Sequence, residues 1–164
     1  MAKCVFAGTF DPITKGHESI IKSCLSKYDS VLVVIGKNGK KTCYFTEEER
    51  YNFAVKTFEK YSNVTVIKYS DYGEKYFDFV KEKGYTVYVR GIRNDKDLQY
   101  EKEMEEKNKV LYPFFTTEYI QADEKVINVS STAVRELIKN GQDFKAFVPD
   151  TVYADIKYAI KEKN

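Results

Sequence analysis

The sequence predicts an α/β protein with a doubly wound, five-stranded parallel sheet followed by C-terminal helices. Short apolar runs alternate with stretches of helical periodicity about 10–15 residues long, which is typical of βαβ units. The run Val31–Ile35 is aliphatic throughout, as expected of a strand buried on both faces of a parallel sheet. No internal repeat or low-complexity linker divides the 164 residues. We therefore expect one Rossmann-like domain spanning residues 1–164.

The first elements follow from periodicity. Lys3–Ala7 is a short apolar run rich in strand formers, and a turn-like segment comes after it. Between His17 and Tyr28, apolar residues recur on one helical face, which predicts a helix. Thr46 stands three residues before Glu49, which is the pattern of a capping box, so a second helix should begin there and continue to about Tyr61.

The middle of the chain continues the alternation. Val64–Lys68 is predicted to be the third strand, and a helix from about Glu74 to Lys83 should end at Gly84. Thr86–Arg90 is predicted to be the fourth strand. A highly charged helix is expected from Asp95 to about Lys109.

The last third supplies one strand and two helices. The fifth strand is expected at Phe114–Ile120. The first helix should run from about Thr132 to Lys139 and end at Gly141, and the second should occupy Asp150–Lys163.

Composition excludes several classes of protein. The chain has 27 Lys and Arg against 25 Asp and Glu, so a net charge of +2 gives no broad basic face for nucleic acid. No apolar run reaches the length of a membrane span, and the start lacks a signal-peptide pattern. Cys4, Cys24 and Cys43 form no CxxC motif and are interpreted as reduced thiols, so we expect a cytoplasmic protein. The 14 Tyr and 11 Phe are interpreted as compositional drift.

Parallel sheets bind ligands at the carboxyl ends of their strands, so residues just after each strand are the candidates for a site. Gly8 and Thr9 follow the first strand and bring backbone and hydroxyl groups close to a ligand. Gly16 and His17 lie at a helix N-terminus, where free N–H groups favour phosphate. His17 is the only histidine, and an ordinary capping or core-edge imidazole is the alternative interpretation.

Other strand ends carry basic and hydroxyl groups. Gly36–Thr42 lacks the spacing of a P-loop but offers lysines that are either solvated or bind phosphates. Arg90 and Arg93 flank a glycine and can grip phosphate. The hydroxyls of Ser130–Thr132 lie at a helix start, where such residues are commonly only caps. Together these groups, with no carboxylate cluster, favour a nucleotide polyphosphate and phosphoryl chemistry performed by positioning and charge stabilisation.

Two motifs carry a family resemblance. Gly8–Pro12 followed by Thr14, Gly16 and His17 resembles the first signature of the nucleotidyltransferase superfamily, T/HxGH. Val129–Thr132 with Arg135 resembles the second signature, ISSTxxR. Other segments resemble bacterial phosphopantetheine adenylyltransferases specifically: Arg90–Arg93 with Asp97, Tyr100 and Glu101, the stretch Phe45–Arg50, and Val148–Val152. The resemblance covers essentially the whole chain.

The resemblance implies adenylyl transfer from ATP to 4′-phosphopantetheine with Mg²⁺ as cofactor. His17 would be the catalytic residue, held as imidazolium by surrounding anions, and Thr9, Lys41, Tyr76 and Arg90 would bind substrate phosphates or the pantetheine arm. Lys41 is preferred to Lys40 because of its distance from Phe45. ATP would contact Thr9, Phe10, His17, Gly91, Ile92, Arg93, Glu101, Val126, Ile127, Asn128, Val129, Ser130, Ser131 and Thr132.

The same resemblance implies a homo-oligomer, typically a hexamer, with no nucleic-acid or membrane partner. Two alternatives stay open. One is a sister nucleotidyltransferase that acts on another phosphorylated acceptor, such as nicotinate mononucleotide or glycerol 3-phosphate. The other is a catalytically idle nucleotide-binding module.

Overall fold

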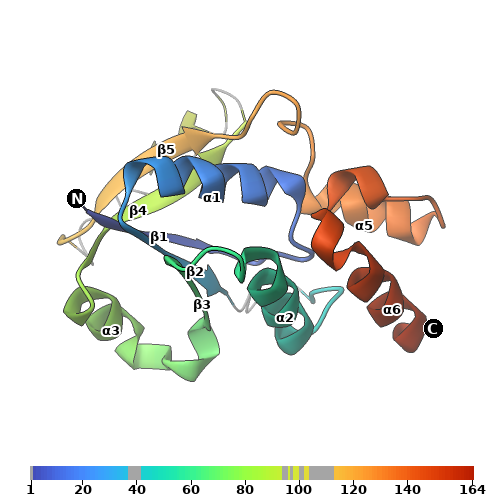
Figure 1. Cartoon of the computed structure of the whole chain (residues 1–164), viewed down its shortest axis with the longest axis horizontal. Coiled ribbons are helices and arrows are strands. Elements are labelled where there is room, and N and C mark those ends of the chain that lie inside the picture. The colour runs from blue at the N-terminus through green and yellow to red at the C-terminus, as the bar shows by residue number, and fades with distance from the viewer. Residues whose placement is uncertain (1, 37–41, 94–95, 97, 100–101, 104–112) are drawn as a thin grey trace.

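The computed structural model describes residues 2–36, 42–93, 96, 98–99, 102–103 and 113–164. Five parallel strands in these ranges form one sheet in the order β3-β2-β1-β4-β5. They are β1 (Lys3–Gly8), β2 (Ser30–Ile35), β3 (Val64–Lys68), β4 (Tyr85–Ile92) and β5 (Thr116–Gln121). The chain moves outward from β1 to β3 and then starts again on the other side of β1 (Figure 1). The predicted doubly wound α/β fold is confirmed.

Helices cover both faces of this sheet. They are α1 (Lys15–Lys27), α2 (Glu47–Phe58), α3 (Tyr76–Glu82), α5 (Ser131–Lys139) and α6 (Tyr153–Lys163). Successive side chains of a strand point to opposite faces. Phe6 and Val33 therefore belong to the core beneath α1, α2, α5 and α6, whereas Val5 and Leu32 belong to a second core beneath α3.

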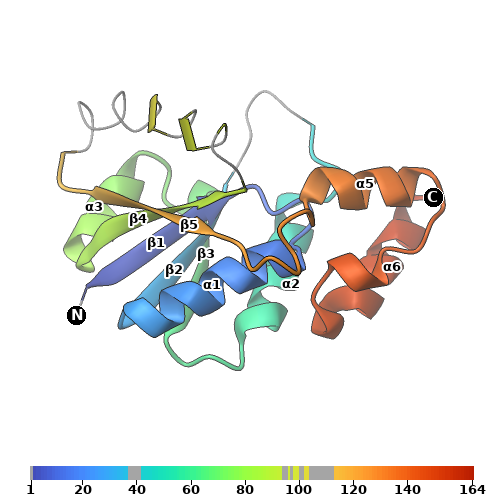
Figure 2. The same cartoon turned by 90° about the horizontal axis from the view of Figure 1, so that it is seen from above.

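The C-terminal helices lie at the end of the sheet where a ligand would bind. Figures 1 and 2 show α5 and α6 together beyond the carboxyl ends of the strands. Val152 and Ile156 are fully buried there. Ion pairs of 2.6 Å join Lys56 of α2 to Asp155 and Glu49 to Lys163. Because exposed ion pairs contribute little, apolar packing mainly holds this end together.

Several predicted boundaries shift. The helix expected from Glu74 begins only at Tyr76, because 3₁₀ turns occupy Tyr69–Asp71 and Gly73–Lys75. Gly84 follows α3 with a φ of +84°, consistent with the predicted stop. Three other boundaries also differ from the prediction. Strand β4 continues past Arg90 to Ile92, and β5 starts at Thr116 instead of Phe114. The last helix is preceded by a 3₁₀ turn at Asp150–Val152. The charged helix expected at Asp95–Lys109 lies largely outside the described residues.

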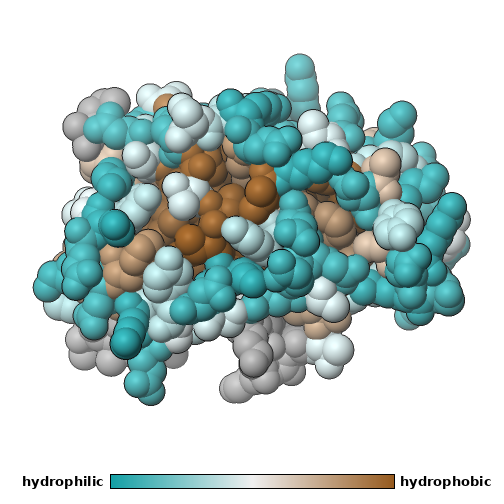
Figure 3. Space-filling model, turned by 60° about the horizontal axis from the view of Figure 1, so that its bottom comes forward, coloured by the Kyte–Doolittle hydropathy of each residue, from teal (hydrophilic) through white to brown (hydrophobic). Residues whose placement is uncertain are grey.

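The surface contains an apolar hollow. Figure 3 shows hydrophobic residues gathered in a depression on one face, with hydrophilic residues around it. A contiguous apolar patch on a protein surface commonly marks an interaction site.

In the ranges given above, no helix is long and apolar enough to cross a membrane.

The capping box of α2 gives a direct test of the sequence interpretation. Thr46 Oγ1 accepts from the Glu49 amide at 3.1 Å, and Glu49 Oε1 accepts from the Thr46 amide at 3.0 Å. Thr46→Ala should lower the free energy of unfolding by about 1 kcal/mol in urea denaturation. Thr46→Ser keeps the acceptor and should change it by less than about half as much. Equal losses in the two variants would contradict a capping role.

Candidate active site

A pocket of about 300 Å³ opens at the carboxyl end of the sheet. Its wall combines the ends of β1 and β4, the segment after β5, and the N-termini of α1 and α5. The strands β1 and β4 are neighbours, but the chain leaves β1 toward β2. The pocket therefore lies at the topological switch point, where doubly wound sheets bind ligands.

The structure brings most of the predicted site residues together. The lining includes Phe10, His17, Arg90, Gly91, Ile92, Arg93, Ile127, Val129, Ser130, Ser131 and Thr132. Thr9, Tyr76, Val126 and Asn128 are not among the lining residues. Lys41 and Glu101 lie outside the described residues.

Some lining residues carry no obvious chemical signal in the sequence. Phe6, Ile20 and Ala122 form apolar wall. Phe6 stands two residues before Gly8 on β1, and Ile20 stands four after Gly16 on α1. Residues at those spacings share one face of a strand or of a helix, so periodicity could have identified the first two. Ala122 follows the end of β5 and has no such signal.

His17 is fixed by the first turn of α1. Thr14 is the N-cap, and its backbone N–H donates to His17 Nδ1 over 3.0 Å. Because Nδ1 accepts this bond, the proton of a neutral imidazole is assigned to Nε2. The Phe10 ring packs edge-on against the imidazole, with centroids 4.7 Å apart. His17 therefore lines the pocket in a defined tautomer with Nε2–H as its remaining donor.

Burial holds this histidine neutral. Desolvation lowers the pKa of His17 from 6.5 to about 4. Without ligand the imidazole is therefore neutral, and the imidazolium form expected beside the anions of a bound substrate stays a prediction. A bound polyphosphate would have to supply the negative charge that offsets this burial.

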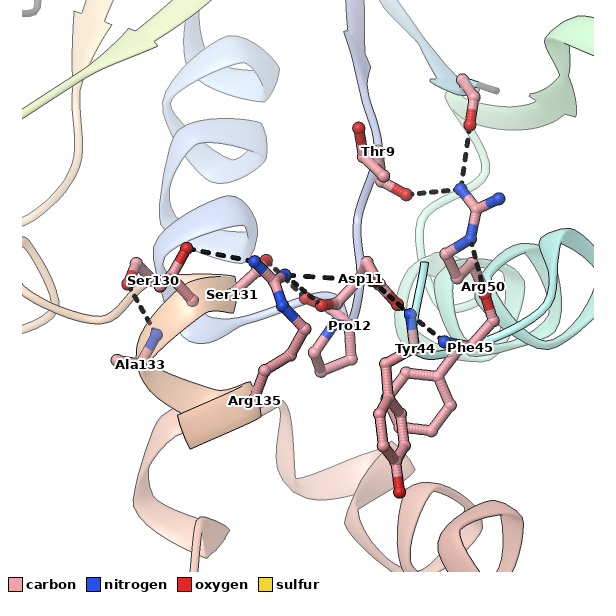
Figure 4. Close-up of polar contacts among 12 residues, drawn as sticks. Thr9, Asp11, Pro12, Tyr44, Phe45, Arg50, Ser130, Ser131, Ala133 and Arg135 are labelled. Carbon is pink, nitrogen blue, oxygen red and sulfur yellow. Dashed lines mark hydrogen bonds and ion pairs between the residues drawn. The ribbon is translucent and has the colours of Figure 1, made fainter. Parts of the chain in front are cut away.

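The turn that follows β1 is anchored by a buried carboxylate. Asp11 is 4% exposed, and its two oxygens accept from the backbone N–H groups of Tyr44 and Phe45 at 2.8 and 2.9 Å. On the other side, Arg135 Nη1 donates to the Asp11 carbonyl at 2.7 Å, and Ser131 Oγ donates to the Pro12 carbonyl at 2.8 Å (Figure 4). These two hydrogen bonds hold the N-terminus of α5 against the loop that follows β1.

Arg50 of α2 binds backbone carbonyls around the same loop, whereas Asp11 binds backbone N–H groups. It is 3% exposed, and its Nη1 donates to the carbonyls of Thr9 at 2.8 Å and Gly36 at 2.9 Å (Figure 4). Its Nε donates to the Phe45 carbonyl at 3.2 Å. In the sequence, Arg50 stands out only as the last residue of the family-like stretch Phe45–Arg50. Its guanidinium joins the loop after β1, through Thr9, to both ends of the β2–α2 connection, through Gly36 and Phe45.

Two glycines allow close packing around the pocket. A Cβ at Gly16 would lie 2.9 Å from the Val129 carbonyl oxygen, so α1 approaches the segment before α5 closely. A Cβ at Gly91 would lie 2.5 Å from Ile20 Cδ1. The absence of a side chain at both glycines therefore lets neighbouring elements of the site pack closely.

The electrostatics of the pocket favour an anion. Arg90 and Arg93 line it, together with the N-termini of α1 and α5. Ser130 caps α5 by accepting from the Ala133 amide at 3.0 Å. None of the lining residues that the structure describes carries a carboxylate. Guanidinium groups and helix N-termini stabilise phosphate, so the pocket is suited to a nucleotide polyphosphate.

Comparison with known proteins agrees with this chemistry. The Cytidylyltransferase-like family model matches residues 5–137, which assigns the chain to the nucleotidyltransferases of that family. A phosphopantetheine adenylyltransferase from Wigglesworthia glossinidia brevipalpis is 34% identical and covers 98% of this chain and 94% of its own length. One from Campylobacter fetus subsp. fetus is 36% identical and covers 94% of this chain and 95% of its own length. The chain belongs to the phosphopantetheine adenylyltransferase family.

A solved structure supports the fold alone. It is a candidate nicotinate-nucleotide adenylyltransferase from Vibrio parahaemolyticus, with a TM-score of 0.69 and 18% identity. It covers 100% of this chain and 98% of its own.

The single histidine makes its titration directly observable. In tag-free protein without ligand, the imidazole NMR signals of His17 should titrate with a pKa of about 4. Because the folded-state pKa lies below the unfolded value of about 6.5, the contribution of His17 to stability is complete above pH 6.5 and is lost as pH falls toward 4. A midpoint at 6.5 or above would contradict the buried, neutral assignment.

Arg50 should contribute far more to stability than an exposed cation on the same helix. Arg50→Met leaves the carbonyls of Thr9, Gly36 and Phe45 without this donor and should lower the free energy of unfolding by about 2–4 kcal/mol. The control is Lys56→Met, which removes an exposed ion pair and should cost less than about 1 kcal/mol. Equal losses by urea denaturation would refute the role of Arg50 in joining the loop after β1 to the β2–α2 connection.

Proposed function

We propose that this protein transfers the adenylyl group of ATP to 4′-phosphopantetheine, forming dephospho-coenzyme A and pyrophosphate. Membership of the phosphopantetheine adenylyltransferase family supports the reaction. The observation that carries the proposal is the position of His17, whose Nε2–H is the free donor of a neutral imidazole in a cationic pocket without a carboxylate. Such a site suits direct phosphoryl chemistry better than base-assisted hydrolysis.

The proposed step is a direct in-line displacement. An oxygen of the acceptor phosphate forms a bond to the α-phosphorus of ATP, while the bond from that phosphorus to the bridging oxygen of pyrophosphate breaks. The bonding electrons leave with pyrophosphate, and no covalent enzyme intermediate forms. A phosphate monoester dianion is already nucleophilic, so the protein has to supply orientation and charge stabilisation.

The described residues divide this work by position. His17 Nε2–H would donate to an α-phosphate oxygen as negative charge develops there. The hydroxyls of Ser130 and Thr132 and the backbone N–H groups at the α5 N-terminus would bind the triphosphate, while the Ser131 hydroxyl stays on the Pro12 carbonyl. Arg90 would hold the acceptor phosphate. Thr9, which Arg50 fixes through its carbonyl, would present its amide and hydroxyl beside the reacting phosphates.

We propose that Mg²⁺ arrives as part of the nucleotide substrate. Within the described ranges, no group of three or more His, Cys, Asp or Glu side chains is placed to hold a metal. This chain therefore offers no carboxylate cage for the ion there, whereas nucleotide phosphates bind it readily. No step assigned to the protein's residues depends on a metal held by the protein.

We also propose a cytoplasmic homo-hexamer. The family resemblance supports the assembly, and the apolar hollow in Figure 3 is the kind of surface that assembly buries. Cys4, Cys24 and Cys43 are all unpaired, which suits a reducing compartment.

The decisive experiment measures pyrophosphate release with Mg-ATP and 4′-phosphopantetheine. Release should require both substrates, and His17→Ala should lower kcat roughly a few hundred-fold or more with a smaller change in the KM for ATP. The control is Lys22→Ala on the exposed face of α1, which should be unaffected. In a parallel titration, Mg-ATP should raise the pKa of His17 above its free value of about 4.

Other acceptors distinguish the alternatives. Activity with nicotinate mononucleotide or glycerol 3-phosphate, but not with phosphopantetheine, would keep the chemistry and overturn the acceptor. ATP binding without turnover on any acceptor would leave an idle nucleotide-binding module. CTP in place of ATP tests the choice of nucleotide.

A further inference from the structure

The high tyrosine and phenylalanine content has a location in the structure. Rings gather around α3 and the neighbouring strands β4 and β5, with centroids of successive pairs 4.3–6.2 Å apart. The members of this aromatic cluster are Tyr69, Tyr72, Tyr76, Phe77, Phe79, Tyr88, Phe114 and Phe115. The interpretation of these residues as compositional drift misses this clustering.

One member of the cluster contacts the active-site pocket indirectly. Tyr88 and Arg90 are two residues apart on β4, so their side chains leave the same face of the sheet. The guanidinium carbon of Arg90 lies 5.4 Å from the centroid of the Tyr88 ring, within the range of a cation–π interaction. Arg90 lines the pocket, whereas Tyr88 and Tyr76 do not. Tyr88 thus contacts Arg90 without lining the pocket itself.

The Tyr88 ring is itself held from two sides. The Phe115 ring packs edge-on against it, with centroids 4.5 Å apart and an angle of 81°. The hydroxyl of Tyr88 is hydrogen-bonded to the hydroxyl of Tyr76, which is only 2% exposed. Burial raises the pKa of Tyr76, while the charge of Arg90 acts in the opposite direction. Tyr76 therefore remains protonated, and Tyr88 is held by one ring contact and one hydrogen bond.

We propose that Tyr88, braced by Tyr76, is a positioning residue that holds the Arg90 guanidinium ready for the acceptor phosphate. The inference deepens the proposed function and rests on its assignment of Arg90 to the acceptor. A flexible arginine loses side-chain entropy when it binds phosphate, and prior fixation on a ring reduces that loss. The effect should therefore appear in acceptor affinity. Tyr76 receives a role through Tyr88 in place of a direct contact with the pantetheine arm.

The kinetic test separates the ring from the hydroxyl. Tyr88→Leu should raise the KM for 4′-phosphopantetheine roughly five- to thirtyfold, with kcat and the KM for ATP changed less than about twofold. Tyr88→Phe keeps the ring and should raise the acceptor KM by less than about threefold. The matched control is Tyr85→Leu, a buried tyrosine of the same strand and core that should leave the acceptor KM unchanged even where it lowers stability.

A double-mutant cycle distinguishes positioning from general destabilisation. In an Arg90→Met background, Tyr88→Leu should change the acceptor KM by less than about twofold, because its effect passes through the missing guanidinium. If Tyr88→Leu raised the acceptor KM by the same factor with and without Arg90, the inference would be overturned. An acceptor KM unchanged in Tyr88→Leu, or raised equally in Tyr85→Leu, would also overturn it while leaving the proposed function intact.

A measurement without substrate keeps the inference testable if the proposed acceptor is wrong. The NMR signal of the Arg90 Nε–H group, assigned by its loss in Arg90→Met, should carry a ring-current shift from Tyr88. That shift should persist in Tyr88→Phe and disappear in Tyr88→Leu, with increased side-chain motion. If wild-type protein shows no turnover with phosphopantetheine, this result still decides the positioning role. An Arg90 signal unchanged by Tyr88→Leu would overturn it.

Discussion

The site depends on how the loop after β1 is held. Asp11 binds two backbone N–H groups at Tyr44 and Phe45, and Arg50 binds the carbonyls of Thr9, Gly36 and Phe45. These charged side chains pair with peptide groups, so each buried charge is met by several dipoles. The loop is thereby tied to the end of β2 and to the start of α2. Arg135 and Ser131 add α5 to the same loop, and the pocket's position follows from this network.

This scaffold is consistent with the proposed role of His17 as a neutral donor to a highly charged substrate. The Thr14 amide occupies Nδ1 of His17, and burial disfavours the imidazolium form. Without ligand, the positive charge of the site therefore lies on arginines and helix N-termini, and the imidazole of His17 is a neutral hydrogen-bond donor. A bound polyphosphate changes the balance, because nearby negative charge favours the protonated ring. The proposed transition-state donor is in this way coupled to the presence of its substrate.

The elements and much of the site could be predicted from local signals. Alternating apolar runs identified the sheet, Thr46 and Ser130 marked helix starts, and the strand ends identified most of the pocket. Arg50 could not be recognised in this way. A charged residue on a helix suggests a solvated face, and only tertiary folding brings the carbonyls of Thr9 and Gly36 to its guanidinium. The left-handed φ of +52° at Phe10, which is 2% exposed, likewise has no local signal in the sequence.

In the proposed reaction, the groups that bind the nucleotide and the arginine that binds the acceptor are supported from opposite faces of the sheet. The proposed nucleotide side is built from backbone groups and short hydroxyls at helix N-termini, whose placement follows from the fold itself. The acceptor side depends on the long side chain of Arg90, whose placement needs support from outside the pocket. The aromatic cluster beneath α3 supplies that support through Tyr88. Changes at Tyr88 and at the rings that contact it can therefore tune acceptor affinity while the proposed nucleotide-binding half keeps its geometry, because the two cores meet opposite faces of the same strands.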